Sequence, residues 1–204
     1  MSTTAVTEPT LVSPGATASR PPHYRFTVAQ FDQLLRDGTI GPQERVELID
    51  GLVVSKMPEN PPHIAVGKLL QDALRAVLPP GWHVSKEDDV VITDYDRPQP
   101  DLAVVRGAAR DYLNRYATPA DIGLGVEISD STLASDRSVK MPRYAAARIP
   151  IDWIVNLVDG HVEVYTDPAG DSYNHCEIFK RGDEIPVVID GKPVGQIAVS
   201  EILP

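Results

Sequence analysis

The stretch Gln99-Pro100-Asp101-Leu102-Ala103-Val104-Val105 decides the fold, because it places an acidic residue at the start of an apolar run. The run predicts a buried β-strand that Asp101 opens. A second strand is predicted over Leu124–Ser129, and it carries Glu127 among apolar neighbours. A carboxylate in such a strand is costly to bury unless it is paired or bound to a metal. Two carboxylates on adjacent strands therefore indicate a site for one hard cation, typically Mg²⁺.

Side-chain direction along the second strand refines this prediction. Successive side chains point to opposite faces of a strand, so Glu127 and Ser129 share one face. A helix is predicted over Asp136–Ala147, directly after this strand. Asp136 and Lys140 lie four residues apart on one face of that helix. Lys140 can then project toward the carboxylates, where it would orient a water or neutralise developing negative charge.

Working outward from these residues, the chain is predicted to form a mixed α/β core around one sheet. Apolar spacing and capping residues predict helices from Thr27 to near Gly38 and from His63 to Leu78. The order in the middle of the chain is helix, three or so strands, helix, strand. Hairpins extend this core at both ends. Strands are expected within Arg45–Lys56, around the Asp50-Gly51 turn, and at Trp82–Ser85, Val90–Ile92, Asp101–Val105, Leu124–Ser129, Ile151–Leu157, Val162–Thr166 and Tyr173–Phe179.

Composition sets limits on the class of protein. The chain has 204 residues, 42% of them hydrophobic, and a formal net charge of −10. This size suits one domain over residues 23–204, and no apolar run approaches the ~20 residues of a membrane span. Residues 1–22 are rich in Ser, Thr, Ala and Pro and lack the features of a secretory signal, so we expect a disordered tail and a cytoplasmic protein. The lone Cys176 excludes a disulfide framework, and we expect it to be an unreactive core thiol.

The acidic balance argues against a nucleic-acid partner, but the charge is unevenly distributed. The segment Arg137–Arg148 holds four basic residues and no acid, and Arg106, Arg110 and Arg115 form a second basic stretch. A local basic rim and a bound cation would still allow a phosphate backbone to approach. We therefore expect weak, salt-sensitive nucleic-acid binding, or an activity that requires a partner protein.

Five blocks in this order resemble the PD-(D/E)xK restriction-endonuclease-like superfamily, and within it the bacterial Uma-type restriction endonucleases. They are FTVAQFDQLL, RVELIDG, PQPDLAVV, VEISDSTLASDRSVKMPRYA and WIVNLVDGHVEVY, spread over Phe26–Pro204. The superfamily core is helix, three strands, helix, strand. Its Pro-Asp pair matches Pro100-Asp101 and its second acid matches Glu127. Its lysine normally lies two residues after that acid, where Ser129 stands here, but several branches carry it on the following helix, as Lys140 does.

The resemblance implies Mg²⁺- or Mn²⁺-dependent hydrolysis of phosphodiester bonds in nucleic acid, with DNA as the expected substrate. Asp101 and Glu127, with the backbone carbonyl of Ile128, would hold the metal, and Lys140 would position the attacking water. It further implies that Glu47, in the ELIDG hairpin, is an auxiliary acid near the metal. Three other residues are expected to line the site, namely His63, Ser129 and Asp136.

Each assignment has a structural alternative. Asp101 would simply accept backbone N–H groups at the start of a strand. Glu127 would be a buried acid paired with Arg143. Lys140 would be a solvated helix lysine, Glu47 a cross-strand partner of a basic residue, and His63 a helix N-terminal residue. Pro142 lies inside the predicted helix, where it is expected to kink the chain and re-aim Lys140.

Three functions from different classes fit these residues. The first is a metal-dependent endonuclease, which a two-fold homodimer would suit. The second is a nuclease fold that binds or regulates without turnover, which the acidic charge and the displaced lysine favour. The third is a metal-dependent phosphoesterase on small nucleotide substrates. The sequence contains no G-x-S-x-G, H-E-x-x-H, P-loop or G-x-G-x-x-G motif, so the commonest hydrolase, metalloprotease and nucleotide-binding classes are disfavoured.

Overall fold

A computed structural model describes residues 23–203, and the predicted tail 1–22 lies outside the described residues. One mixed sheet of six strands, in the order β3-β4-β5-β6-β7-β8, forms its centre. Only β5 and β6 are parallel, and every other neighbouring pair is antiparallel. The strands are β3 (Trp82–Lys86), β4 (Leu102–Arg106), β5 (Ile122–Ser129), β6 (Ile151–Asn156), β7 (His161–Ala169) and β8 (Ser172–Lys180).

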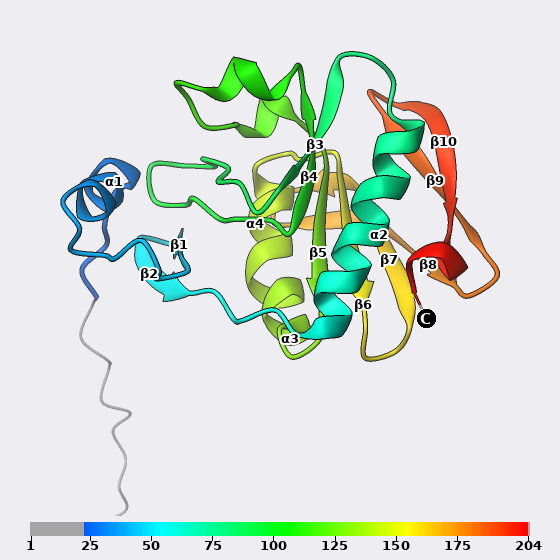
Figure 1. Ribbon diagram of the computed structural model, residues 1–204, viewed down its shortest axis with the longest axis horizontal. Helices are drawn as coiled ribbons and strands as arrows, with labels where there is room; N and C mark the ends of the chain where they lie inside the picture. The colour runs from blue at the N-terminus through cyan, green and yellow to red at the C-terminus, as the bar shows by residue number, and fades with distance from the viewer. Residues whose placement is uncertain (1–22, 204) are drawn as a thin grey trace, which may run out of the picture.

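The helices cover opposite faces of this sheet (Figure 1). On one face lie α2 (Pro61–Val77), the hairpin β9 (Glu184–Ile189) and β10 (Lys192–Ala198), and the short helix α5 (Val199–Ile202). On the other face lies α4 (Met141–Ala146). The order α2, β3, β4, β5, α4, β6 confirms the predicted helix, three strands, helix, strand core.

The N-terminal part packs at the side of the core as a separate unit of structure (Figure 1). It consists of α1 (Val28–Arg36) and the hairpin β1 (Val46–Ile49) and β2 (Leu52–Ser55). Thr27 caps α1 by accepting the N–H of Gln30, as its position predicts. Arg97 fastens the hairpin to the core, because Leu48 and Arg97 exchange backbone hydrogen bonds of 2.7 and 3.2 Å.

Strand alternation explains why one face of β5 is apolar and the other polar. Val126 and Ile128 belong to the large core under α2. Glu127 and Ser129 point to the opposite face, where they contact the segment that follows β5. The whole of β5 is buried, so these polar groups must find partners within the protein.

The predicted helix Asp136–Ala147 is not a continuous α-helix. A π-helical turn, η3 (Asp136–Lys140), precedes α4, and the short helix α3 (Leu133–Ser135) leads into it. Met141 donates its N–H to the carbonyl of Asp136, five residues earlier. Pro142 has no N–H to donate, and it stands in the first turn of α4, directly after this π-helical turn. In place of the expected kink, the helix widens into a π-helical turn. Asp136 and Lys140 are both buried in this turn.

Two other expectations are wrong. Val90–Ile92 does not form a strand, because Val90 makes only an isolated bridge to Ala117. Cys176 is exposed rather than part of the core, since it lies on an outward-facing position of β8. In the described residues, no helix is long and apolar enough to cross a membrane.

Candidate active site

A cavity of about 400 Å³ opens where the β1–β2 hairpin, the start of α2 and the end of β5 meet. Seven of the eight residues predicted from the sequence line this cavity or contact a residue that does. Glu47, His63, Asp101, Glu127, Asp136 and Lys140 line the wall, and Ile128 donates its backbone N–H to Asp101. The fold thus brings residues from five separate elements to one place. Ser129 lies beneath the wall and is fully buried.

Asp101 is held by three donors at the start of β4. Its Oδ1 lies 3.0 Å from Nζ of Lys56, and its Oδ2 lies 3.0 Å from Nε2 of His63. Oδ2 also accepts the backbone N–H of Ile128 at 2.8 Å. Burial alone would raise the pKa of Asp101, but the His63 hydrogen bond and the charges of Lys56 and Lys140 outweigh it and hold the pKa well below its usual range. Asp101 is therefore a carboxylate at neutral pH.

Lys140 reaches inward, so the alternative of a solvated helix lysine is wrong. Its side chain is 8% exposed, and Nζ lies 3.1 Å from Oε2 of Glu127 and 3.4 Å from Oε2 of Glu47. Burial would lower the pKa of Lys140, but the charges of Glu127, Glu47 and Asp101 raise it, so the ammonium stays protonated. Oε2 of Glu47 also accepts the N–H of Gln99 at 3.1 Å, so this one oxygen faces both the backbone and the lysine.

Glu127 has a different second partner from the one expected. Tyr144 donates its hydroxyl to Oε1 of Glu127 at 2.6 Å, whereas Arg143 pairs with Asp96 at 2.8 Å. The Glu127–Arg143 alternative is therefore wrong. Burial raises the pKa of Glu127, and this effect outweighs the opposing charge of Lys140, while the charges of Asp101 and Asp136 raise the pKa further. A cation placed between these acids would relieve that repulsion.

Ser129 stands where the superfamily lysine is normally found, and it has a structural contact there. Its hydroxyl donates to Oδ2 of Asp136 at 2.7 Å, with both side chains buried. This bond ties the π-helical turn to the end of β5. It thereby fixes the turn from which Lys140 extends.

His63 lies at the N-terminus of α2 and also lines the site, so both interpretations of this residue apply. Its N–H bonds to the Asn60 side chain, which caps α2, and its ring reaches Asp101. The hydrogen bond and charge of Asp101 outweigh burial and raise the pKa of His63. Nδ1 of His63 and Oε1 of Glu59 are buried, lie 3.6 Å apart and have no hydrogen-bond partner in the described residues.

The structure adds Lys56, Glu59 and Tyr144 to the predicted site. Lys56 bonds to Asp101 and to Glu87, at 3.0 and 3.1 Å. A two-residue Asp-Gly turn fixes the hairpin register, and that register places Glu47, Val54 and Lys56 on one face, so the sequence did contain this signal. Tyr144 follows Lys140 by four residues, which is also a readable spacing. The position of Glu59 in the sequence does not indicate that it reaches the site. Its location depends on the path of the connection 57–60 between β2 and α2.

The donor set suits a hard divalent cation. Oxygen ligands from one or two carboxylates are what Mg²⁺ prefers, and Mn²⁺ also accepts imidazole nitrogen. Ligand atoms of Glu59, His63 and Asp101 lie within 4.8 Å of one another. Oε1 of Glu59 has no hydrogen-bond partner in the described residues, but it lies 3.8 Å from Nζ of Lys86 and 3.9 Å from Nη2 of Arg45. Glu127 is not part of this group, and its carboxylate bonds to Lys140 and Tyr144. Asp101 is the residue that this group shares with the predicted Asp101–Glu127 position.

Asp152 lies behind the site as an unpartnered buried carboxyl. It is fully buried on β6 opposite Gly125, and neither of its oxygens has a hydrogen-bond partner in residues 23–203. A Cβ at position 125 would lie 3.2 Å from Oδ1 of Asp152, which explains the glycine. Burial raises the pKa of Asp152 well above its usual range.

Replacing Asp152 with asparagine is expected to stabilise the protein at neutral pH. Because the folded state holds the Asp152 proton more tightly than the unfolded state, stability falls as the pH rises above the ordinary carboxyl pKa of about 4. We therefore expect D152N to raise the free energy of unfolding by about 1 kcal/mol at pH 7, a typical size for a single substitution, and by almost nothing at pH 3. Urea unfolding at both pH values measures this, with the exposed Asp171→Asn as control; an equal gain at both pH values would contradict it.

Fold and site together define a restriction-endonuclease-like α/β protein. The chain belongs to the Uma2 family, described as "putative restriction endonuclease", whose model matches residues 28–191. The structure is similar to the crystal structure of a "putative nuclease" from Anabaena variabilis, with a TM-score of 0.66 and 16% sequence identity, over 87% of this chain and 97% of that one. No curated protein matches the chain. These comparisons confirm the predicted family and fold.

Proposed function

We propose that this protein is a metal-dependent endonuclease that hydrolyses phosphodiester bonds in DNA. The observation that carries the proposal is the convergence of Asp101, Glu127 and Lys140 on the floor of one cavity, from β4, β5 and η3. Family membership supports a nucleic-acid substrate. The expected homodimer stays a prediction.

Asp101 and Glu127 would hold Mg²⁺ or Mn²⁺, together with the Ile128 carbonyl. The N–H of Ile128 bonds to Asp101, and the N–H and C=O of one residue point to the same side of a strand, so this carbonyl faces the Asp101 side. Glu59 and His63 offer a further pair of ligands beside Asp101. When bound, such a cation polarises the phosphate and lowers the pKa of a coordinated water.

The remaining groups of the site would position the reactants and neutralise the charge that develops during the reaction. The ammonium of Lys140 can donate to an attacking water and offset the negative charge that develops on the phosphate. Glu47 keeps this ammonium in place from its other side. His63 and Lys56 orient the Asp101 carboxylate through its two oxygens.

A binding module without turnover is the second candidate, and one observation favours it. Both oxygens of Asp101 already have partners, Lys56 at Oδ1 and His63 at Oδ2. In a protein that never bound metal, these two partners would satisfy the Asp101 carboxylate. Binding of Mn²⁺ is therefore the property that separates the two candidates.

Removal of divalent cations is expected to stop cleavage completely. Purified protein with Mg²⁺ or Mn²⁺ should nick or linearise supercoiled plasmid, and excess EDTA should prevent it. Titration calorimetry with Mn²⁺ should show binding at or below millimolar metal. Cleavage that survives EDTA would refute metal dependence, and the absence of both Mn²⁺ binding and cleavage would favour the binding module.

A further inference from the structure

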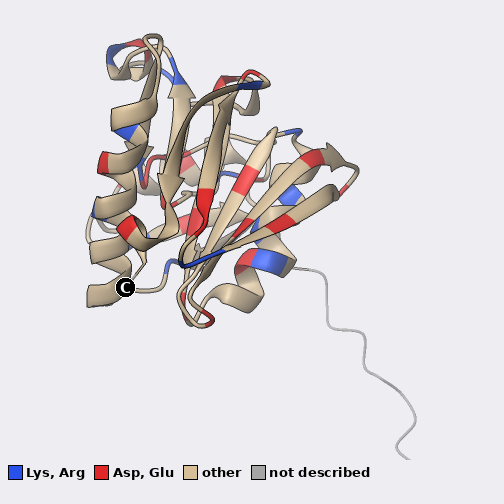
Figure 2. Ribbon diagram, turned by 90° about the vertical axis from the view of Figure 1, so that its right-hand side faces the viewer, with Lys and Arg blue, Asp and Glu red and all other residues tan. Residues whose placement is uncertain are grey.

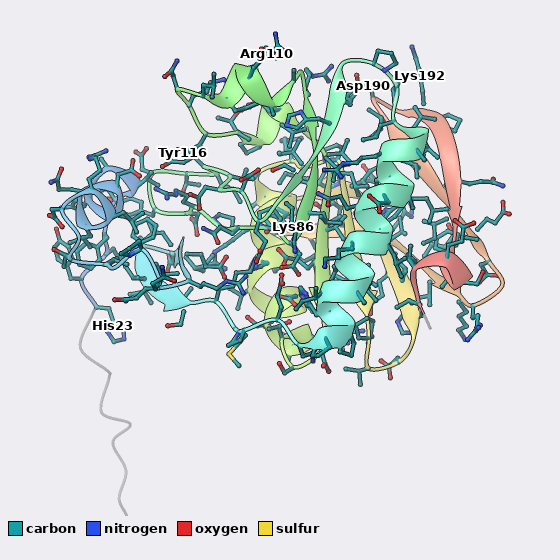
Figure 3. All side chains as sticks on the ribbon, in the orientation of Figure 1. His23, Lys86, Arg110, Tyr116, Asp190 and Lys192 are labelled. Carbon is teal, nitrogen blue, oxygen red and sulfur yellow. The ribbon has the colours of Figure 1, made fainter. Side chains whose placement is uncertain are left out.

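A second cavity, of about 330 Å³, lies beside β3 and the segment that follows β4. Its wall combines aromatic rings with hydrogen-bond acceptors. Neither the family description nor the proposed reaction assigns it a role. Figure 3 labels Tyr116, which lines it, and Lys86, which ends β3 beside Glu87. The residues that matter here are His83, Ser85, Glu87, Asp88, Tyr112 and Tyr116.

The rings of this cavity are held in place before any ligand arrives. The rings of His83 and Tyr112 are 5.7 Å apart between centroids, and the Tyr112 hydroxyl donates to the carbonyl of Arg106 at 2.7 Å. Arg115 stacks over Tyr112 at 4.4 Å and is itself fixed by a bidentate pair with Asp121. Fixed rings lose little entropy when a flat ligand stacks on them.

The ring of Tyr116 is likewise held by an arginine stacked on it. The guanidinium of Arg97 lies 4.4 Å from its ring centroid and is only 3% exposed. Arg97 is held in turn by ion pairs with Asp32 and Asp89. The cavity therefore has two braced tyrosines, each with a cation on its ring.

The polar groups of the wall are mostly acceptors. Nδ1 of His83 lies 2.9 Å from the carbonyl of Gly107, which can only accept, so the neutral ring presents Nε2 as an acceptor. Ser85 donates to one oxygen of Asp88 at 2.5 Å, and Asp88 forms no ion pair within residues 23–203. Acceptors of this kind match the exocyclic amino groups of adenine and cytosine, and thymine has none.

A short chain of contacts joins this cavity to the candidate active site. Glu87 lines the second cavity, and its carboxylate lies 3.1 Å from Nζ of Lys56. Lys56 lies 3.0 Å from Asp101. Lys56 thus connects a residue of the second cavity to Asp101 through two ion pairs.

The charges near the site give a reason for such a cavity. Lysines and arginines are interspersed with acids over the described residues (Figure 2). The basic stretches seen in the sequence are largely paired: Arg106 with Asp190, Arg115 with Asp121, Arg137 with Glu163 and Arg143 with Asp96. Arg110 and the exposed Arg148 form no ion pair in this part of the chain. Arg110 lies at the edge of the molecule, far from α3 and the start of α2 (Figure 3). The expected basic rim is therefore mostly neutralised, and contacts to phosphate can supply little of the affinity.

We propose that the second cavity binds an unpaired, amino-bearing nucleobase next to the bond that is cut. The proposal rests on the nucleic-acid substrate of the proposed function. Stacking on a protein ring strengthens binding about five- to 100-fold per base and requires a base outside a duplex. The substrate class is accordingly single-stranded DNA, or DNA with an unpaired segment at the site.

Anisotropy of fluorescein-labelled 12-nucleotide DNA, measured in EDTA so that no strand is cut, tests the proposal. Wild-type protein should bind oligo-dA and oligo-dC more tightly than oligo-dT, and an abasic strand of equal length should bind worst. Y112A should weaken the binding of oligo-dC about five- to 100-fold, the equivalent of losing one stacked base. Y112F should bind like wild type. The matched control is Y95A, because Tyr95 also stacks with an arginine, Arg25, but lies outside this cavity.

The exposed Asp88 gives a second variant that does not endanger folding. D88N should reduce the preference for oligo-dC over oligo-dT while the binding of oligo-dT stays unchanged. Equal binding of the abasic strand, unchanged binding by both Y112A and D88N, or no binding by wild type would overturn the proposal. If binding behaves as expected but no cleavage is ever seen, only the proposed nuclease activity fails.

Discussion

Replacing Lys140 with methionine is expected to abolish metal-dependent cleavage and to lower the free energy of unfolding by about 3–5 kcal/mol. Lys140 supplies the only ammonium that contacts Glu127 in the described residues, and both side chains are buried. Its removal leaves a buried carboxylate without a charge partner. Glu47, which also contacts this ammonium, is left in the same position.

A double variant separates the two effects. K140M with E127Q removes both charges of the pair, so we expect the double variant to recover much of the lost stability but none of the cleavage. Urea unfolding and plasmid nicking measure the two properties on the same preparations. The exposed Lys68→Met serves as control and should behave like wild type. Cleavage by K140M at more than about one-tenth of the wild-type rate would exclude a role for this lysine in positioning the water.

Replacing Asp101 with asparagine is expected to eliminate Mn²⁺ binding and to slow cleavage by more than about 100-fold, because even indirect partners of a metal cost 10- to 100-fold when they are removed. Asp101 is the one carboxylate shared by both possible cation positions. The effect on folding should be smaller than for Lys140. Lys56 keeps Glu87 and the carbonyl of Gln99, so no charge is left without a partner.

The measurement is titration calorimetry with Mn²⁺, followed by nicking assays on the same samples. The exposed Asp94→Asn removes the same charge outside the cavity and should keep both properties. A further comparison with E59Q shows whether Glu59 and His63 take part. Loss of cation affinity in E59Q would place a cation beside Glu59, and unchanged affinity would restrict it to Asp101 and Glu127. Unaltered Mn²⁺ binding by D101N would contradict the assignment.

The two predictions depend on different kinds of sequence information. Asp101 and Glu127 are conspicuous because they interrupt apolar strands, and the cost of burying a carboxylate makes such positions informative. Lys140 is conspicuous only after Ser129 is seen to occupy the expected lysine position. Its inward direction depends on the π-helical turn before Pro142, which spacing alone does not predict.

The distribution of charge is a property that the sequence predicted wrongly. The segment Arg137–Arg148 is basic when read along the chain, and we expected it to form a rim for phosphate. In the structure Arg137 faces Glu163 and Arg143 faces Asp96, from strands and loops far away in sequence. Linear clusters predict a local field only when the opposite charges are not folded against them.

The sequence by itself determined the family, the order of the core elements and the two strand carboxylates, since alternation, turn dipeptides and apolar runs are local properties of the chain. The tertiary structure decided which groups surround those carboxylates. Lys56, Glu59 and Tyr144 reach the site from a hairpin, a connection and a helix, and their convergence depends on long-range packing. The second cavity likewise arises where β3 meets the segment after β4. Its tyrosines and acids are unremarkable in the sequence, because only the fold brings them onto one wall.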